Sequence, residues 1–336
     1  MRPKKRATIH DVAKLAGVSI YAVSRTLNNQ PGVSAGARGA VLRVSRELGM
    51  RPRTAPRRRH FALIIPDRGA FQPGGYVSNV TFELLHEVSA RGMGLSLFND
   101  ADFATMARQV FDGVFVLSWQ QATIDLLPTI GHTPIVVVNR FTLADRYHVV
   151  GWDHVAEGRS VGEYLLRRGH RCPGMIAAVP LSRHSTRSRL EGLRAVYAEA
   201  GLPLGKQLAE ALETPDQLVA ALRRMRDRRV DALYFPGQER LGIEAVRLLQ
   251  GVFHLRVPDD VSVVSGENAG WSGLTDPPLT TVDAPLELLS QHCVDHMLKL
   301  VENRPTQLAE VLIATPIIER MSVAERQSAL ADRKAR

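Results

Sequence analysis

Near the start of the chain, apolar positions recur at helical spacing in two short groups separated by a glycine. The first group consists of Ile9, Val12, Ala13 and Ala16. Residues three or four apart share one face of a helix. The second group, Val23 and Leu27, follows Gly17, which is expected to end the first helix. Val18 can fill the space between the two. The pattern predicts two short helices joined by a tight turn.

Polar residues mark where these helices begin. Thr8 and Asp11 match a capping box, in which the hydroxyl accepts from a free backbone N–H and the acid three residues later reaches back. Ser19 is the expected cap of the second helix, and Ser34 that of a third helix ending at residues 48–49. Two short helices and a turn are the architecture that lays a recognition helix into the DNA major groove.

Charge strengthens the nucleic-acid interpretation. Residues 1–60 hold 14 lysines and arginines but only two acids, Asp11 and Glu47, so this segment carries +12. The whole chain carries +9, so the remaining residues sum to −3. Such an asymmetry is typical of a module that binds a polyphosphate partner.

Downstream of residue 60, short apolar runs alternate with amphipathic stretches, beginning with a helical pattern over Asn79–Ala90. The runs that predict strands are residues 61–65, 95–98, 114–117, 135–138, 175–179, 232–235 and 261–264. Short continuous apolar strands between helices are typical of parallel sheets covered on both faces. We therefore predict an α/β core of two subdomains, with a ligand cleft between them outside the strand ends.

The predicted organisation is a helix-turn-helix headpiece over residues 1–50, a basic hinge over 51–60, a two-lobed core over 61–325 and a flexible tail over 326–336. Cys172 and Cys293 are far apart and lack metal-type spacing, which predicts isolated thiols and no metal. No apolar run is long enough to span a membrane, and the basic N-terminus lacks the apolar core of a signal peptide. These features predict a cytoplasmic protein. Motifs for nucleotide, serine-hydrolase or zinc chemistry are absent, so we expect neither an enzyme nor a cofactor.

Several segments carry a resemblance to one family. They are TIHDVAKLAGVS from Thr8, VSRTLNN from Val23, VSAGAR from Val33, RELGMRP from Arg46, VFDGV from Val110, RLEG from Arg189, VPDDVSVV from Val257 and PLTTV from Pro278. Together they resemble the lactose-repressor (LacI) family over residues 7–320. The resemblance implies a DNA-binding transcription factor, usually a repressor, whose core resembles periplasmic sugar-binding proteins and senses a small molecule.

The resemblance also assigns roles in the headpiece. Ile20, Tyr21 and Arg25 occupy the places from which the family's recognition helix reads bases, and Arg25 can bond guanine bidentately. An alternative interpretation is that Tyr21 packs against the first helix. The full set of expected DNA-binding residues, phosphate anchors included, is Thr8, Ser19, Ile20, Tyr21, Ala22, Arg25, Asn28, Ser34, Arg38 and Arg53.

The chain departs from the family pattern at two places near the DNA. Gly36 and Gly39 each weaken the third helix by roughly 0.5–1 kcal/mol relative to alanine, so we expect its first turn to fray. The family's hinge helix carries a leucine that wedges into the minor groove. Here Pro56 and the arginines of residues 57–59 stand instead, so we expect no full hinge helix, less bending, and a steep salt dependence of binding.

An effector site is expected at Arg189, Glu267 and Asp153, which match the family's ligand-binding positions. The family's Asn-Asp pair is replaced by Pro236 and Gly237, which removes two polar contacts. An alternative to ligand binding is that Arg189 forms a salt bridge within the core. Two aromatic residues that follow strands are expected to stack on a ligand ring or, alternatively, to pack in the core. They are Phe71 and Trp119.

The prediction is therefore a homodimeric regulator that binds a near-palindromic operator in double-stranded DNA and responds to a small-molecule effector, for example a sugar. One alternative is a regulator that has lost its effector site. Another is a sugar-binding module without DNA, against which the +12 headpiece argues.

Overall fold

The computed structural model describes residues 7–28, 30–48, 59–67, 75–178, 180–268, 270–302 and 308–326. Arg53, Pro56 and Phe71, and with them most of the predicted hinge, lie outside these ranges. The chain divides into two compact units. Unit 1 comprises residues up to Gly151 together with Leu286–Val311, and unit 2 comprises Trp152–Pro285 together with residues from Leu312 on.

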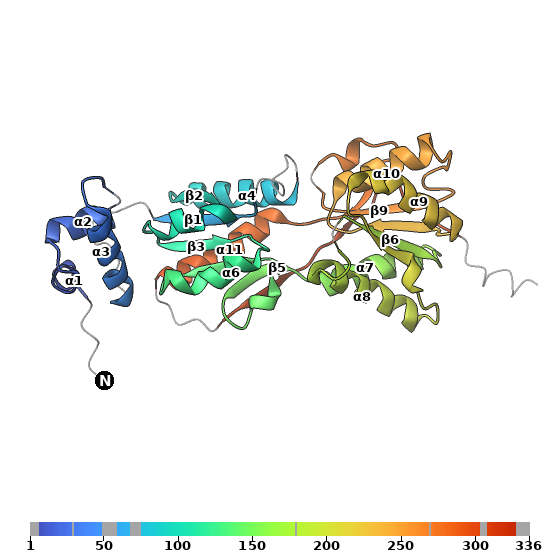
Figure 1. The fold of residues 1–336 in the computed structure, drawn as a ribbon. Helices are drawn as coiled ribbons and strands as arrows, with labels where there is room; N and C mark the ends of the chain where they lie inside the picture. Colours follow the sequence, from blue (N-terminus) through green and yellow to red (C-terminus); the bar gives the residue numbers. More distant parts are fainter. Residues whose placement is uncertain are drawn as a thin grey trace, which may run out of the picture. The chain divides into compact units, whose positions relative to one another are not determined.

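The headpiece contains three helices, α1 (Ile9–Ala16), α2 (Ile20–Leu27) and α3 (Ala35–Glu47), drawn in blue in Figure 1. Their apolar faces meet in a small core. Its buried members are Val12, Ala13, Val23, Leu27, Val41 and Val44. The two-helix prediction is confirmed, and the turn between α1 and α2 depends on Gly17, whose φ of 65° is left-handed.

All three predicted N-caps are present. Thr8 and Asp11 form the capping box, Ser19 accepts from the Ala22 N–H at 3.1 Å, and Ser34 accepts from the Ala37 N–H at 3.3 Å. The expected fraying of the third helix is wrong for this structure, since α3 is helical from Ala35 onward. The Ser34 cap satisfies a first-turn donor and offsets part of the cost of the two glycines.

Unit 1 is built on a six-stranded sheet in the order β11-β5-β4-β3-β1-β2. Its strands are β1 (His60–Ile65), β2 (Gly94–Asn99), β3 (Gly113–Val116), β4 (Ile135–Val138), β5 (His148–Trp152) and β11 (Glu310–Ile313). The pairings among β1 to β5 are parallel. Parallel strands place their carboxyl ends along one edge of the sheet, where loops can hold a ligand.

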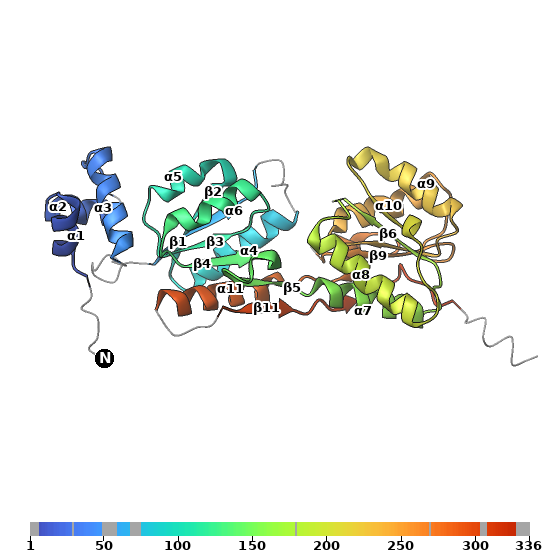
Figure 2. The same cartoon turned by 60° about the horizontal axis from the view of Figure 1, so that its bottom comes forward.

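Helices cover both faces of this sheet (Figure 2). They are α4 (Tyr76–Ala90), α5 (Phe103–Ala107), α6 (Gln121–Leu126) and α11 (Leu286–Val301). Ala62 and Ile64 pack with α5 and α6 in one core. On the other face α11 approaches β3 so closely that a Cβ on Gly113 would lie 2.2 Å from the Met297 sulfur. The helix α11 therefore returns to unit 1 from the far end of the sequence.

Unit 2 has a second six-stranded sheet in the order β12-β10-β9-β8-β6-β7. Its strands are β6 (Pro173–Ala177), β7 (Ala209–Ala211), β8 (Ala232–Phe235), β9 (Ser262–Gly266), β10 (Thr280–Val282) and β12 (Ile317–Ile318). Only β12 pairs antiparallel among the pairings described for this sheet. In Figure 2, one face carries α9 (Leu218–Asp227) and α10 (Glu239–Gly251), and the other carries α7 (His154–Arg167) and α8 (His184–Glu199).

The helices α7 and α8 pack unusually closely. A Cβ on Gly158 of α7 would lie 2.0 Å from the Arg189 carbonyl oxygen, and one on Gly192 of α8 would lie 2.2 Å from the Val155 carbonyl oxygen. Only glycine permits such an approach of two backbones. The contact brings the side chains of α7 and α8 together at the edge where the strands end.

The predicted α/β core with parallel sheets is confirmed, and each of the seven predicted strands is present within a few residues of its expected bounds. The prediction missed five short strands among the residues that the structure describes: β5, β7, β10, β11 and β12. These strands hold polar residues such as His148, Thr280 and Thr281, or only two or three residues. Their pairing with neighbours, rather than an apolar run, makes them strands.

Candidate functional site

The helix α2 presents an exposed face beside a buried one. Val23, Thr26 and Leu27 are buried against the rest of the headpiece, whereas Ile20 is 41% exposed and Tyr21 is 66% exposed. The alternative that Tyr21 packs against the first helix is therefore not what the structure shows. An exposed isoleucine and tyrosine at the start of a capped helix, in a module this basic, suit contact with base edges and sugars.

Arg25 lies one turn after Tyr21 and is held by two hydrogen bonds. Its Nη1 donates to the Tyr21 hydroxyl at 2.8 Å, and its Nε donates to the Pro31 carbonyl at 2.7 Å. The guanidinium also lies 5.3 Å from the centre of the Tyr21 ring. Because a guanidinium has five N–H donors, both Nη atoms keep N–H groups for a base. The predicted role of Arg25 is compatible with this geometry.

The loop between α2 and α3 is tied to both helices. Arg38 donates from Nη2 to the Gln30 carbonyl at 2.6 Å, next to the Pro31 carbonyl that Arg25 holds. Asn28 donates from Nδ2 to the Ser24 carbonyl at 2.9 Å. The sequence did not indicate this arrangement. It means that Arg25, Arg38 and Asn28 first shape the headpiece, and their DNA contacts stay predictions.

Among the residues expected near the hinge, Arg59 is described and forms an ion pair with Glu302 of unit 1 at 2.9 Å. Arg59 immediately precedes β1, so its position is set by the sheet and by the end of α11. Its contribution to the salt dependence of DNA binding stays a prediction.

At the carboxyl-end edge of the unit 2 sheet, Arg189 occupies a buried polar cluster. Its Nε lies 2.7 Å from Glu157 Oε2, with the two side chains 10% and 2% exposed. The Tyr234 hydroxyl donates to Glu157 Oε1 at 2.6 Å, and the His154 ring lies 3.6 Å from Glu157 Oε2. The salt bridge proposed as the alternative for Arg189 is thus present. Arg189 nevertheless faces the strand ends, since a Cβ on Gly237 would lie 3.6 Å from its Nη1.

Two further carboxylates share this edge. Glu267 follows β9 directly and has a left-handed φ of 60°, a strained conformation of the kind that clusters at ligand sites. Glu239, the first residue of α10, is buried and accepts from the Ser272 N–H at 2.9 Å, while its second oxygen has no partner in the described part of the chain. The cluster therefore sets three carboxylates against the single guanidinium of Arg189.

The charges divide unequally within the cluster. Burial is the largest influence on Glu157 and opposes its ionisation. The charge of Arg189, together with the contacts from His154 and Tyr234, outweighs burial and lowers the pKa of Glu157 to about 2. For Glu267, burial is the largest influence and raises the pKa. The positive charge of Arg189 lowers the pKa only in part, and repulsion from Glu239 and Glu157 raises it further. The pKa of Glu267 is therefore about 8. Burial and the charge of Arg189 lower the pKa of His154 to about 4. At neutral pH Glu157 is ionised, His154 is neutral, and Glu267 holds a proton it can donate.

The remaining predicted effector residues are not brought into this cluster by any described contact. Asp153 caps α7, its Oδ1 accepting from the Ala156 N–H at 2.9 Å. Trp119 follows β3 in unit 1 and is half-buried, with its ring centre 6.3 Å from that of Tyr76. The sequence did not predict four members of the cluster, which are His154, Glu157, Tyr234 and Glu239. The one sequence feature that could have indicated them is the hydroxyl of Tyr234, a polar group in an otherwise apolar strand.

No group of described side chains has the composition of a metal site, and none of the described helices is long and apolar enough to cross a membrane. Both cysteines are free thiols, and burial raises the pKa of Cys172 above its ordinary value.

Comparison with known proteins identifies both parts of the chain. Residues 8–53 match the family model of bacterial regulatory proteins of the lacI family. Residues 163–323 match that of the periplasmic binding protein-like domain.

Curated relatives align along nearly the whole chain. The chain is 29% identical over 346 residues to the HTH-type transcriptional regulator CelR of Thermobifida fusca, covering 96% of this chain and 100% of that protein. It is 27% identical over 334 residues to the HTH-type transcriptional repressor PurR of Edwardsiella ictaluri, covering 95% and 97%.

Solved structures agree with the fold. A complex of the transcriptional regulator CelR with cellobiose matches with a TM-score of 0.68 at 27% identity, covering 94% of this chain and all of that one. The lac repressor dimer bound to operator and an anti-inducer matches with a TM-score of 0.68 at 21% identity, covering 95% of this chain and all of that one.

Proposed function

The chain belongs to the LacI family of DNA-binding transcriptional regulators, and we propose that it is a repressor that binds a near-palindromic operator as a homodimer in the cytoplasm. The observation that supports this most directly is the recognition face of α2, where Ile20 and Tyr21 are exposed and Arg25 is oriented. Two such faces on a two-fold dimer read two half-sites with related sequences.

Within each half-site we assign the outward face of α2 to base recognition. Arg25 donates from its Nη atoms to guanine O6 and N7, Ile20 contacts a thymine methyl or a sugar, and Tyr21 lies beside Arg25. The caps Ser19 and Ser34, together with Arg38, anchor phosphates at the helix N-termini, where backbone N–H groups and the helix dipole favour an anion.

A selection of bound sequences from random duplex DNA by the full-length protein tests this. The expected result is an inverted repeat whose half-sites each contain a guanine that depends on Arg25. Recovery of sequences with no common motif, or of a single non-repeated half-site, would contradict the proposal.

We further propose that the cluster around Arg189 binds a neutral, hydroxyl-rich effector. Glu157 already compensates the charge of Arg189, and Glu239 and Glu267 add carboxyl groups. An anionic ligand would meet these carboxylates at close range, whereas sugar hydroxyls can both donate to them and accept from the protonated Glu267. The complex of the relative CelR with cellobiose supports a ligand of this class.

The effector proposal is tested by thermal shift of the full-length protein with neutral mono- and disaccharides, cellobiose included, and with their phosphorylated counterparts. A neutral sugar is expected to stabilise the protein, and Glu267→Ala, which removes the hydrogen-bonding group, to weaken its binding by roughly 1–3 kcal/mol. Glu244→Ala, at an exposed position of α10, is the matched control. Binding of phosphorylated sugars alone would contradict the ligand class. Binding of no small molecule would favour a regulator without an effector.

A further inference from the structure

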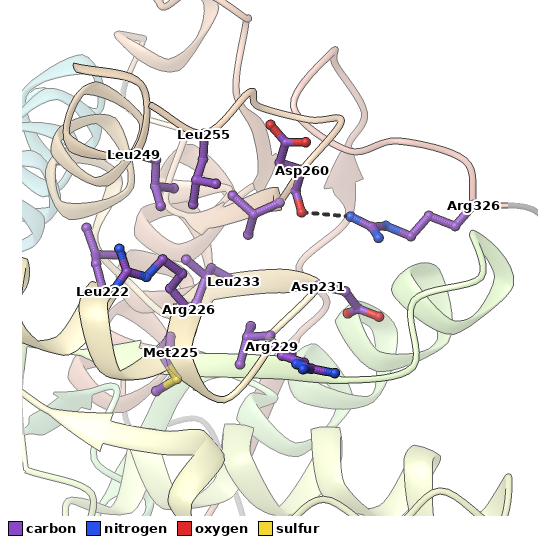
Figure 3. Close-up of a pocket in the computed structure, with 12 residues that line it drawn as sticks. Leu222, Met225, Arg226, Arg229, Asp231, Leu233, Leu249, Leu255, Asp260 and Arg326 are labelled. Atoms are coloured by element: carbon purple, nitrogen blue, oxygen red, sulfur yellow. Dashed lines mark hydrogen bonds between the residues drawn. The ribbon is translucent and has the colours of Figure 1, made fainter. Parts of the chain in front are cut away.

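A cavity of about 230 Å³ lies at the opposite edge of the unit 2 sheet, away from the Arg189 cluster (Figure 3). Asp231 stands just before β8 and Val261 just before β9, so the cavity opens at the amino ends of these strands. Leu222 comes from α9, Leu249 from α10, and Arg326 from the last described residues. No residue of the proposed effector site lines it.

The inner wall of the cavity is apolar. Leu222, Leu233 and Leu249 contribute side chains that are only 1–2% exposed. Figure 3 shows them together with Leu255 around the space. An apolar cavity of about 150 Å³ is enough to bind benzene. The present one therefore has room for a substituted ring or a branched chain.

Charged side chains lie around this apolar wall, and both acids among them are already compensated. Asp231 accepts from the backbone N–H groups of Arg171 and Cys172 at 2.7 and 3.1 Å and faces His170 at 3.6 Å. These contacts outweigh burial and keep the pKa of Asp231 below its ordinary value. Asp260 is paired with Arg256 at 2.8 Å.

The arginines that line the cavity are compensated unequally. Arg226 pairs with Asp227 at 2.9 Å. Arg326 donates from Nη2 to two backbone carbonyls, one of them that of Asp260 at 3.0 Å, and its buried Nε has no partner among the described residues. The guanidinium of Arg229 makes no hydrogen bond or ion pair within the described part of the chain. Among the described residues that line the cavity, the guanidinium of Arg229 is therefore a positive charge without a carboxylate partner.

We propose that this cavity is a second ligand site, which binds a small organic anion with an apolar body, such as an aromatic or branched carboxylate. The apolar body packs against Leu222, Leu233 and Leu249, and the carboxylate lies toward Arg229. An apolar pocket with a few polar groups at one side is the usual form of a small-molecule site. A guanidinium is well matched to a carboxylate because it can donate two parallel hydrogen bonds.

The test is calorimetric titration of the full-length protein with 4-methylbenzoate, and with 4-methylbenzamide as the neutral probe of the same shape. Saturable binding of the carboxylate is expected, with the amide weaker. Arg229→Gln should weaken carboxylate binding by about two- to fivefold, because a hydrogen-bonded ion pair is lost at an exposed position. Arg223→Gln, at an exposed arginine of α9 that does not line the cavity, should leave binding unchanged.

A second variant examines the apolar wall. Leu255→Phe places a larger side chain at a half-buried position of the wall and should weaken both probes, provided that the melting temperature shows a folded protein. Absence of saturable binding would overturn the proposal, and so would equal binding to the wild-type protein and Arg229→Gln. Binding that Arg189→Gln abolishes and Arg229→Gln leaves intact would also overturn it, since the probe would then occupy the Arg189 cluster. The proposal does not depend on the effector, so its failure leaves the proposed function standing.

Discussion

At the scale of single residues, the same side chains serve folding and recognition in the headpiece. Arg25 and Arg38 each donate to a carbonyl of the loop between α2 and α3, and Ser19 and Ser34 each cap a helix. A substitution at any of these positions therefore changes the shape of the DNA-binding surface as well as its contacts. Tests of base recognition need a comparison between specific and non-specific DNA.

For Arg25→Ala we predict loss of selectivity with much of the general affinity retained. A bidentate contact to a base contributes about 1–3 kcal/mol of discrimination, whereas the phosphate contacts survive. Competition binding to operator and scrambled duplexes at one salt concentration measures this. Arg43→Ala, an exposed arginine on α3, removes the same charge and should lower both affinities alike. An equal loss on both duplexes for Arg25→Ala would assign that residue to phosphate anchoring.

In unit 2 the buried pair of Glu157 and Arg189 predicts a large stability effect. Glu157→Ala leaves the guanidinium of Arg189 unpaired and removes the acceptor of Tyr234, so the free energy of unfolding should fall by about 3–5 kcal/mol. Urea denaturation followed by circular dichroism measures it. Glu163→Ala, an exposed acid on the same helix, should change stability by less than about 1 kcal/mol. A loss that small for Glu157→Ala would mean that the pair is not a stabilising contact.

At the scale of elements, close backbone packing decides where the polar cluster lies. The helices α7 and α8 approach each other over Gly158 and Gly192, and this approach sets Glu157 and Arg189 side by side. Some other glycines of the chain have no such constraint. A Cβ on Gly36 or Gly251 would meet nothing within 4 Å.

Gly158→Ala is therefore expected to destabilise unit 2 by about 1–3 kcal/mol or more, because the new methyl group would lie 2.0 Å from a backbone carbonyl that cannot move alone. Gly251→Ala in α10 is the matched control and should be neutral or stabilising by up to about 1 kcal/mol. Chemical denaturation of both variants gives the comparison. A neutral Gly158→Ala would show that the two helices can separate at little cost.

At the scale of the whole molecule, the opposite pKa directions in one cluster make stability depend on pH. Glu267 has a pKa raised from its ordinary value of 4.5 to about 8, so the folded state holds a proton that the unfolded state releases. Its contribution to stability is complete below about pH 4.5 and is lost as the pH rises through 8. Glu157, with a pKa lowered to about 2, contributes above pH 4.5 and loses its contribution as the pH falls toward 2.

The resulting prediction concerns the alkaline side. Between pH 5 and 9 the melting temperature of Glu267→Gln should fall less steeply than that of the wild-type protein, because glutamine stays neutral throughout. Glu244→Gln should keep the wild-type slope. Parallel slopes for the wild-type protein and Glu267→Gln would mean that the carboxyl of Glu267 ionises as freely in the folded state as in the unfolded one.

Local sequence determined the headpiece and most of the strands. The caps Thr8, Ser19 and Ser34 lie three residues or fewer from the donors they satisfy, and the apolar strands are short continuous runs. Helix capping and hydrophobic periodicity act within a few residues, so the sequence shows them directly. The resemblance of the headpiece motif to one family then predicted the functional class, a DNA-binding transcriptional regulator.

Only the tertiary structure decided the polar cluster and the second cavity. Glu157, Arg189, Tyr234 and Glu267 come from four different elements, and the sheet order and the glycine contact of α7 with α8 bring them together. Arg229 and Arg326 meet at one cavity although nearly a hundred residues separate them. The charge state of a buried group depends on its neighbours in space rather than in sequence. The competition between Arg189 and three carboxylates therefore became visible only in the folded chain.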